Sequence, residues 1–292
     1  MILNIEMKVA LLFSGQVRRI NIELFRYSLA NFVRNLDYQI YIYCWEEIGK
    51  SMNHNLANVN NIFDKNAINL IRDYFEGFNV KAIQSESFIS FRDNLSYKYK
   101  NIINSNEFDK KTINSLPQIY TISESFKLMS DDIDSYDLIF RCRFDTPFLH
   151  PLDLYDLARL KKSNMVYSIN FGRAFNHNRI YDIFFGGSKN SMMFLGQIWN
   201  DLPNLIINDF DNKLDKRDAC RLLFISATEF GSKVDTFETR ICDIYRNSPN
   251  NYFEKYIIAM HLVSLKGLHK NFFSLIYFLK WFKYRNINLI II

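Results

Sequence analysis

The segment YDLIFRCRFDTP, residues 136–147, gives the clearest indication of the fold. An apolar run leads directly into two arginines and an aspartate, and a proline then ends regular structure. In an α/β protein this pattern is typical of a buried strand that carries charged side chains to the carboxyl edge of a sheet, where ligands bind. Arg141, Arg143 and Asp145 alternate along the chain, so an extended backbone would point all three side chains to the same side.

This grouping of charges has two interpretations. Two guanidinium groups beside one carboxylate suit an anionic ligand, held with or without a divalent metal. The alternative is an internal ion pair between arginine and aspartate at the end of a strand. The residues themselves leave both interpretations open.

The sequence on the amino-terminal side predicts a parallel sheet. A short apolar run at 8–14, KVALLFS, ends in a Ser-Gly-Gln turn, and apolar residues then recur at helical spacing over 22–36. The next run, QIYIYCW at 39–45, is rich in strand-forming residues. A strand, a helix and a strand in so short a span are the signature of a right-handed βαβ crossover. We therefore predict an α/β fold with a mostly parallel sheet flanked by helices.

The rest of the chain continues this alternation. Further helices are predicted at 67–75, 117–129, 152–160 and 216–230, with another that Ser188 caps and that runs through Met192 to Trp199. Further strands are predicted at 80–84, 165–169 and 180–185. The last of these strands leads into Gly186 and Gly187, which we take as a turn. Residues 50–66 and 90–115 are polar and lack clear periodicity, so both are predicted to be loops.

Composition narrows the class of protein. Net charge is +5, from 36 basic and 31 acidic residues, which is too small an excess to indicate a nucleic-acid-binding protein. The four cysteines are widely spaced and fit free thiols in a reducing cytoplasm. The first residues make a poor signal peptide, and no stretch reaches the roughly 18 apolar residues of a membrane span. We therefore expect a cytoplasmic protein.

The carboxyl-terminal residues differ in character from the rest. Residues 1–245 are predicted to form one domain, whereas residues 246–292 combine many aromatic and aliphatic residues with lysines. This second part is predicted to be a basic, aromatic helical extension. It would lie on an anionic membrane surface, or form a contact with the core or with another copy in an oligomer.

Several chemically useful residues fall at predicted strand ends. They are Ser14, Gly15, Gln16 and Arg18 after the first strand, Trp45 at the end of the second, and the segment from Arg141 to Asp145. A parallel sheet brings such ends to one edge. The resulting cleft would be electropositive apart from one carboxylate, which suits a nucleotide diphosphate, and the turn at Gly15 could place backbone N–H groups near a phosphate. The chain has no glycine-rich dinucleotide or P-loop motif.

Four short pieces of the chain resemble a known family in the same order. They are LLFSGQVR at 11–18, YCWEE at 43–47, YDLIFRCRFD at 136–145 and DIFFGGS at 182–188. Together they are similar to WavE-type lipopolysaccharide-synthesis proteins and related capsule glycosyltransferases of bacteria. The resemblance covers about residues 7 to 200, with Glu229 as a further match.

This resemblance implies a glycosyltransferase with a GT-A-like, Rossmann-type domain. Such an enzyme would move a sugar from a nucleotide-sugar donor to a glycan or lipid-linked glycan acceptor of a capsule, O-antigen or lipooligosaccharide. It would work in the cytoplasm, at the inner face of the membrane. The strand-end residues named above would bind the donor, with Trp45 stacking on a base or sugar.

The resemblance also implies a divalent metal, but with a departure from the usual motif. Such folds hold Mn²⁺ or Mg²⁺ on a D-x-D sequence at a strand end. Here position 143 is arginine, so only Asp145 aligns with a metal-binding carboxylate. Either Asp145 binds the metal with mostly water and phosphate ligands, or Arg141 and Arg143 replace part of its charge.

An inverting transfer further requires a carboxylate that accepts the proton of the acceptor hydroxyl. Asp182 and Glu229 are the candidates. Two other functions stay open. One is a non-catalytic nucleotide-sugar-binding or assembly protein of the same fold. The other is a different phospho-sugar transferase, which usually needs two carboxylates at its metal. Asp137 is no second ligand, because it opens the strand and is expected at the far end.

Overall fold

The computed structural model describes residues 7–18, 20, 22–48, 66–104, 110–148, 151–152, 154–169, 178–208 and 218–237. The strands in these ranges are β1 (Lys8–Gly15), β2 (Asp37–Trp45), β3 (Val80–Glu86), β4 (Leu138–Cys142), β5 (Met165–Ser168), β6 (Phe184–Ser188) and β7 (Lys233–Thr236). The α-helices are α1 (Ile22–Val33), α2 (Ala67–Phe75), α3 (Phe88–Asp93), α4 (Tyr97–Asn104), α5 (Lys110–Met129), α6 (Leu154–Lys162), α7 (Lys189–Met192), α8 (Ile198–Asn208) and α9 (Ala219–Glu229). Two 3-10 helices are η2 (Ser130–Ser135) and η3 (Met193–Gly196).

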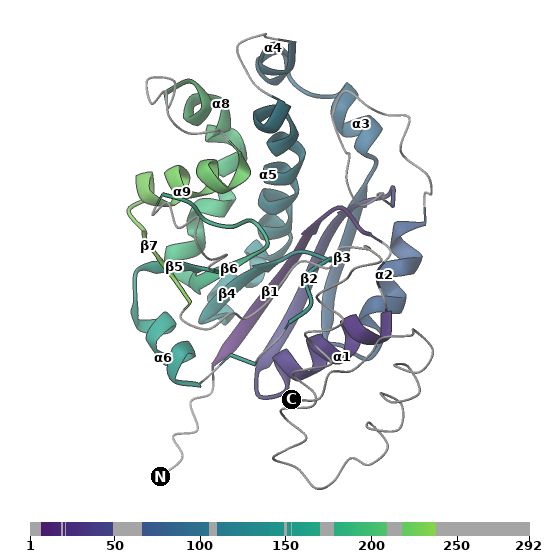
Figure 1. The fold of residues 1–292 in the computed structure, drawn as a ribbon, viewed down its shortest axis with the longest axis vertical. Coiled ribbons are helices and arrows are strands. Elements are labelled where there is room, and N and C mark those ends of the chain that lie inside the picture. The colour runs from purple at the N-terminus through teal and green to yellow at the C-terminus, as the bar shows by residue number, and fades with distance from the viewer. Residues whose placement is uncertain are drawn as a thin grey trace, which may run out of the picture. The chain divides into compact units, whose positions relative to one another are not determined.

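The described strands form one seven-stranded sheet in the order β3-β2-β1-β4-β6-β5-β7 (Figure 1). Strands β1 to β4 are parallel to one another, and β5 is parallel to β7. Strand β6 runs antiparallel to both of its neighbours. The prediction of an α/β protein with a mostly parallel sheet is confirmed.

Helices cover both faces of this sheet (Figure 1). Helices α1, α2 and α6 pack with the alternate residues of β1 that include Leu11 and Phe13. Helices α5, α8 and α9 pack with the other set, which includes Ala10 and Leu12. Because both faces are covered, seven of the eight residues of β1 are buried, and the strand reads as a continuous apolar run.

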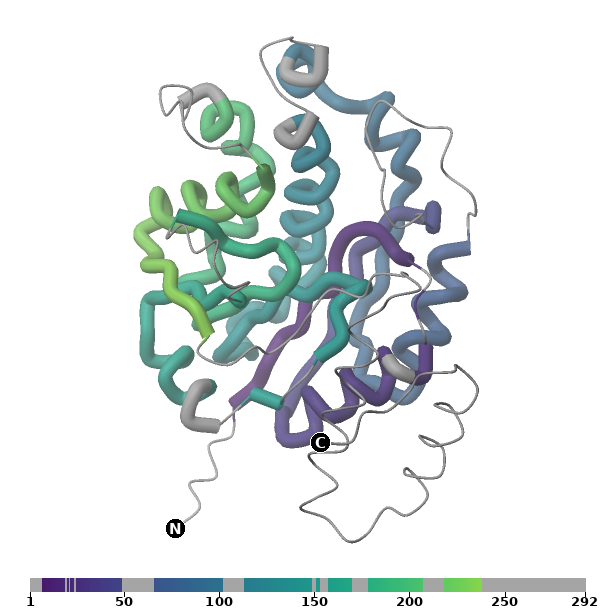
Figure 2. The backbone as a smooth tube through the Cα atoms, viewed as in Figure 1, coloured from purple at the N-terminus to yellow at the C-terminus, as the bar shows by residue number. Residues whose placement is uncertain are grey.

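The order of the strands fixes where a ligand site is expected. From β1 the chain passes to β2 and then to β3 on one side, and it returns through α5 to β4 on the other side of β1. The connection therefore changes direction between β1 and β4. In open α/β sheets the crevice outside the carboxyl ends of the strands at such a switch point is the usual ligand site. Figure 2 shows the segments that leave β1 and β4 at this same edge.

One predicted strand was wrong in its extent. The strand lies at Phe184–Ser188 instead of 180–185, so Gly186 and Gly187 lie inside β6 and do not form a turn. Packing explains the glycines, because a Cβ on Gly186 would lie 2.2 Å from the ring of Phe140. A Cβ on Gly187 would lie 2.4 Å from the carbonyl oxygen of Met165.

The predicted loop at 90–115 was also wrong in part. Helices α3 and α4 occupy much of this region, and α5 begins at Lys110, so Pro117 lies inside α5 and not in its first turn. Ser87 caps α3 by accepting a hydrogen bond from the backbone N–H of Ser90. Helices α3 and α4 have only six and eight residues, so their periodicity is hard to detect in the sequence. Strand β7 was not predicted, because it has four residues and Val234 is its one strongly apolar side chain.

Two sequence-based predictions lie outside the described residues. They are the helical extension at 246–292 and nearly all of the loop at 50–66. Within the described part of the chain, no helix combines the length and the apolar character needed to cross a bilayer.

Candidate functional site

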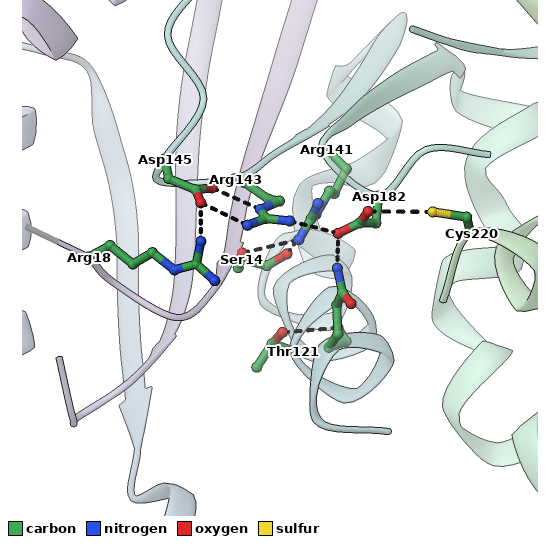
Figure 3. Close-up of polar contacts among 9 residues, drawn as sticks. Ser14, Arg18, Thr121, Arg141, Arg143, Asp145, Asp182 and Cys220 are labelled. Carbon is green, nitrogen blue, oxygen red and sulfur yellow. Dashed lines mark hydrogen bonds and ion pairs between the residues drawn. The ribbon is translucent and has the colours of Figure 1, made fainter. Parts of the chain in front are cut away.

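The turn after β4 holds a buried carboxylate between two arginines (Figure 3). Asp145 is 2% exposed. Arg143 donates from Nε to Asp145 Oδ1 at 2.8 Å and from Nη2 to Oδ2 at 2.7 Å, which makes a bidentate pair. Arg18, which follows β1, donates from Nη1 to the same Oδ2 at 2.5 Å. The segments that leave β1 and β4 are thus joined by ion pairs at the switch point.

These charges control one another's ionisation. Burial alone would raise the pKa of Asp145, but the charges of Arg143 and Arg18 outweigh burial and hold that pKa below its ordinary value. Burial alone would lower the pKa of Arg143, but Asp145 and Asp182 outweigh it and raise that pKa. The cluster is therefore fully ionised at neutral pH.

Arg141 lies beside this cluster but is held differently. It belongs to β4, faces the same side of the sheet as its partner Leu12, and is 1% exposed. Its Nε donates to Ser14 Oγ at 3.1 Å and its Nη2 to the Ser14 carbonyl at 3.2 Å. Its Nη1 is buried and has no hydrogen-bond partner among the described residues. Burial lowers the pKa of Arg141 to about 10, so it stays protonated at neutral pH.

Asp182 reaches the same edge from the other direction. Because β6 is antiparallel, a residue that precedes it lies next to the carboxyl end of β4. Asp182 Oδ2 accepts from Arg143 Nη1 at 3.1 Å and from the side-chain amide of Gln118. Within the described ranges its Oδ1 receives only the thiol of Cys220, with the sulfur 3.5 Å away. Burial raises the pKa of that thiol, so it is a neutral donor. Asp182 thus has one saturated oxygen and one weakly bonded oxygen.

Helix α5 and the end of β1 lie next to Arg141. Gly15 has a φ of +108°, a conformation that other residues rarely adopt. A Cβ there would lie 3.8 Å from Thr121 Oγ1 and 3.9 Å from Arg141 Nη2, so the backbone conformation, and not lack of space, favours glycine. Helix α1 begins only at Ile22, so the Gly15 turn does not lead directly into a helix N-terminus.

Three other predicted residues lie outside this cluster. Trp45 is buried on the face covered by α5, with its ring stacked on that of Tyr120 at a centroid distance of 5.9 Å. Glu229 ends α9 and is exposed, just before β7 begins at the amino edge of the sheet. The sheet therefore separates Glu229 from Asp145 and Asp182. Gln16 is half-buried in the segment between β1 and Arg18.

The residues around Asp145 do not fit a divalent metal as they are arranged. Both carboxylate oxygens accept hydrogen bonds from guanidinium groups, and these two cations would repel a metal ion placed there. Among the described residues, no group of three His, Cys, Asp or Glu side chains gathers around a common point. In this arrangement the positive charge that a metal would supply is already provided by Arg18 and Arg143.

Sequence reasoning missed the contribution of α5. Gln118 was placed only in a predicted helix, since it belongs to no motif and carries no charge. Its role depends on the crossing of α5 over the switch point, which brings its amide to Asp182. A residue pattern along one helix does not contain this information.

The cluster as a whole carries an excess of positive charge. Among the described residues, Arg18, Arg141 and Arg143 face only two carboxylates, Asp145 and Asp182, and the surplus cation is the most deeply buried one. Such an arrangement can bind an anion.

No protein-family model matches the chain, and no curated protein matches its sequence.

Proposed function

We propose that this protein is a glycosyltransferase with a GT-A-like domain that binds the diphosphate of a nucleotide sugar at the switch point between β1 and β4. The observation that carries the proposal is Arg141 Nη1, a buried cationic donor that has no partner in the part of the chain that the structure describes. A buried charge without compensation is costly, so such a donor is expected where a bound anion completes its hydrogen bonds.

The arginines have enough free donors to receive two phosphates. A guanidinium carries five N–H donors. In the described structure Arg18 uses one of them, Arg141 uses two and Arg143 uses three. The side chains of Arg18 and Arg143 are 24% and 20% exposed, so a diphosphate can reach their free N–H groups while Asp145 keeps both arginines in place. Arg141 Nη1 is buried, so the ligand reaches it only if this edge opens around the bound phosphates. Asp145 is then a positioning residue that aims Arg18 and Arg143 at the ligand.

This arrangement suits the departure of a nucleoside diphosphate. In glycosyl transfer the bond between the anomeric carbon and the diphosphate oxygen breaks, and its electron pair leaves with the diphosphate. The acceptor hydroxyl oxygen forms the new bond to that carbon and gives up its proton. Fixed guanidinium groups stabilise the negative charge that grows on the leaving group, and one such interaction is typically worth about 100-fold or more in rate.

Asp182 is the base that we propose for the acceptor proton. Its Oδ2 is occupied by Arg143 and Gln118, which orient the carboxylate. Its Oδ1 has only the weak thiol donor of Cys220 and can accept a proton. Glu229 lies at the opposite edge of the sheet and takes no part in this mechanism.

The acceptor and the place of action rest on the resemblance alone. We propose a glycan or lipid-linked glycan of a bacterial surface polysaccharide, modified in the cytoplasm at the inner face of the membrane. Cosedimentation of the full chain with anionic and neutral vesicles tests the membrane part. Equal binding to both kinds of vesicle, or binding to neither, would argue against it.

The test of the proposed function is binding and turnover of nucleotide sugars. UDP-sugars and GDP-sugars are expected to raise Tm, and CMP-sugars, which carry one phosphate, are expected to raise it less. At least one donor should release its nucleotide when saccharide acceptors are added. Arg141→Met should lower turnover by about 100-fold or more. Lys161→Met, which removes a half-exposed lysine at the amino edge, is the matched control.

The remaining outcomes separate the alternatives. Stabilisation by a nucleotide sugar without turnover favours a binding or assembly protein. Binding that persists in EDTA agrees with the arginine site, whereas binding lost in EDTA and restored by Mn²⁺ or Mg²⁺ places a metal at Asp145, as the sequence predicts. If no nucleotide sugar stabilises the protein with or without these ions, the proposed function is wrong.

A further inference from the structure

A second carboxylate at the carboxyl edge has one oxygen without a partner. Glu86, the last residue of β3, accepts hydrogen bonds at Oε2 from the hydroxyl of Tyr43 at 2.6 Å and from the hydroxyl of Tyr120 at 2.7 Å. In the described part of the chain its Oε1 receives no hydrogen bond. Glu86 is only partly buried, so this oxygen belongs to a residue that solvent and ligands can reach.

The two tyrosines hold this carboxylate in place. Their rings meet edge to face at 6.1 Å, and Tyr120 also stacks on Trp45. Burial, followed by the hydrogen bond to Glu86, raises the pKa of Tyr43, so its hydroxyl remains a donor. Burial likewise raises the pKa of Tyr120. A carboxylate fixed through one oxygen by two donors presents the other oxygen in a defined direction, as a preorganised binding group does.

Glu86 lies on the same face and edge of the sheet as the arginine cluster. The register pairs Ser14 of β1 with Tyr43 of β2, and Trp45 of β2 with Glu86 of β3. Two strand spacings separate β1 from β3, which is about 10 Å. A nucleoside diphosphate whose phosphates lie near Ser14 can reach across this distance.

Helix α5 contacts both the arginine cluster and Glu86. Gln118 donates to Asp182 on the side of the arginines, and Tyr120 donates to Glu86 on the other side. Residues two apart on a helix point in nearly opposite directions, so α5 has one of these carboxylates on each flank. Thr121 lies beside Gly15 between them.

We propose that Glu86 Oε1 accepts hydrogen bonds from the ribose hydroxyls of the donor nucleoside. This inference rests on the proposed function and assigns its nucleoside subsite. A carboxylate at a strand end is well suited to a vicinal diol, because it accepts from both hydroxyls and is itself no donor. The site would therefore select ribonucleotides over deoxyribonucleotides.

The variant Glu86→Gln separates this role from a structural one. The amide oxygen of glutamine can still accept from Tyr43 and Tyr120, while its NH₂ group replaces the outward acceptor with a donor. Glu76→Gln is the matched control, because the Glu76 side chain is 73% exposed and pairs with Arg26, away from Tyr43 and Tyr120. The probes are UDP, GDP, CDP and ADP, their 2′-deoxy forms, and inorganic pyrophosphate, each titrated by calorimetry.

We expect the native protein to bind at least one ribonucleoside diphosphate about tenfold more tightly than its 2′-deoxy form. Glu86→Gln should remove this difference and leave pyrophosphate affinity unchanged, which also shows that the variant is folded. Tyr120→Phe should reduce the difference by a smaller factor. If the preference for ribose survives in Glu86→Gln, the inference about Glu86 is wrong, while the proposed function is unaffected. Failure of the native protein to bind pyrophosphate or any nucleoside diphosphate overturns the proposed function and this inference with it.

Discussion

The two edges of the sheet both carry charged networks, but they are built differently. At the amino edge Asp137 accepts from the backbone N–H of Lys8 at 3.1 Å and pairs with Lys161 at 2.8 Å, and its side chain is 29% exposed. At the carboxyl edge Asp145 pairs with two arginines and is nearly inaccessible. Arg141 adds a buried cation that pairs with no carboxylate among the described residues.

This difference separates structural charges from functional ones. An exposed pair costs little to form, contributes little and leaves no group unsatisfied. A buried cluster with one cation too many is unfavourable for the isolated protein, and such an arrangement is typical of a site that a ligand completes. The predictions below compare the two edges, beginning with the largest expected effect.

Removal of a carboxylate should be costly only at the carboxyl edge. Asp145→Asn leaves the partly buried Arg18 without its carboxylate partner and leaves Arg143 with Asp182 alone, so it should lower the free energy of unfolding by about 3–5 kcal/mol. Asp137→Asn removes a half-exposed partner and should lower it by about 0–1 kcal/mol. Urea denaturation of the two variants measures both values. If both variants lose the same free energy of unfolding, the proposed difference between the charged networks of the two edges is wrong.

Removal of Arg141, the surplus cation, should weaken ligand binding and leave the stability of the fold nearly unchanged. Arg141→Met loses two hydrogen bonds to Ser14 but also removes a desolvated charge, so the free energy of unfolding should change by about 1 kcal/mol or less. Affinity for a nucleoside diphosphate should fall by about 100-fold. Calorimetric titration with UDP and GDP, together with urea denaturation, tests this. A large loss of stability with unchanged affinity would make Arg141 a structural residue.

Two glycines with positive φ allow a matched comparison of strain. Gly15 has a φ of +108° beside Arg141, and Gly77 has a φ of +83° with no atom within 4 Å of an added Cβ. Alanine at either position should lower the free energy of unfolding by about 1–2 kcal/mol. Only Gly15→Ala should also weaken nucleotide binding, because it shifts the backbone next to Arg141. The measurement is the ratio of the nucleotide dissociation constants of Gly15→Ala and Gly77→Ala, with the Tm of each variant as the check on equal destabilisation. A ratio near one would contradict the prediction.

Protonation of Asp145 should cause part of the loss of folding stability at low pH. Its pKa is lower in the folded protein than in the unfolded chain, so its contribution to stability is present above the unfolded value of about 3.9 and is lost as pH falls through the folded value. Asp145→Asn should therefore show a weaker loss of stability than the native protein does as pH falls below about 3.9. Unfolding followed by circular dichroism over this range checks the slope. Parallel curves for the two proteins would show that other groups control acid unfolding.

Local sequence patterns were enough to predict much of the fold. The apolar runs of β1, β2 and β4 identify buried strands, and the periodicity of α2 matches Ala67–Phe75. The direction of β6 could not be predicted, because alternation along a strand is the same whichever way the strand runs. The sequence suggested a strand that ended near Asp182. In the structure Asp182 instead precedes β6, and it lies at the carboxyl edge of the sheet because β6 is antiparallel to β4.

The candidate site was predictable mainly where charge follows a strand. Arg18, Arg143 and Asp145 were recognised because their charges directly follow buried strands, and the structure brings them into contact. Glu86 and Gln118 could not be recognised, since the tertiary crossing of α5 gives them their partners. The pairing of both Asp145 oxygens with arginines was one of the two interpretations left open by the sequence, and side-chain geometry was needed to see it.

The most direct test of the central claim is a crystal structure with a bound nucleoside diphosphate. Crystals grown with UDP or GDP should place a phosphate oxygen about 2.7–2.9 Å from Arg141 Nη1, with Asp145 still bonded to Arg18 and Arg143. A diphosphate bound elsewhere, with Arg141 Nη1 still lacking a partner, would contradict the account.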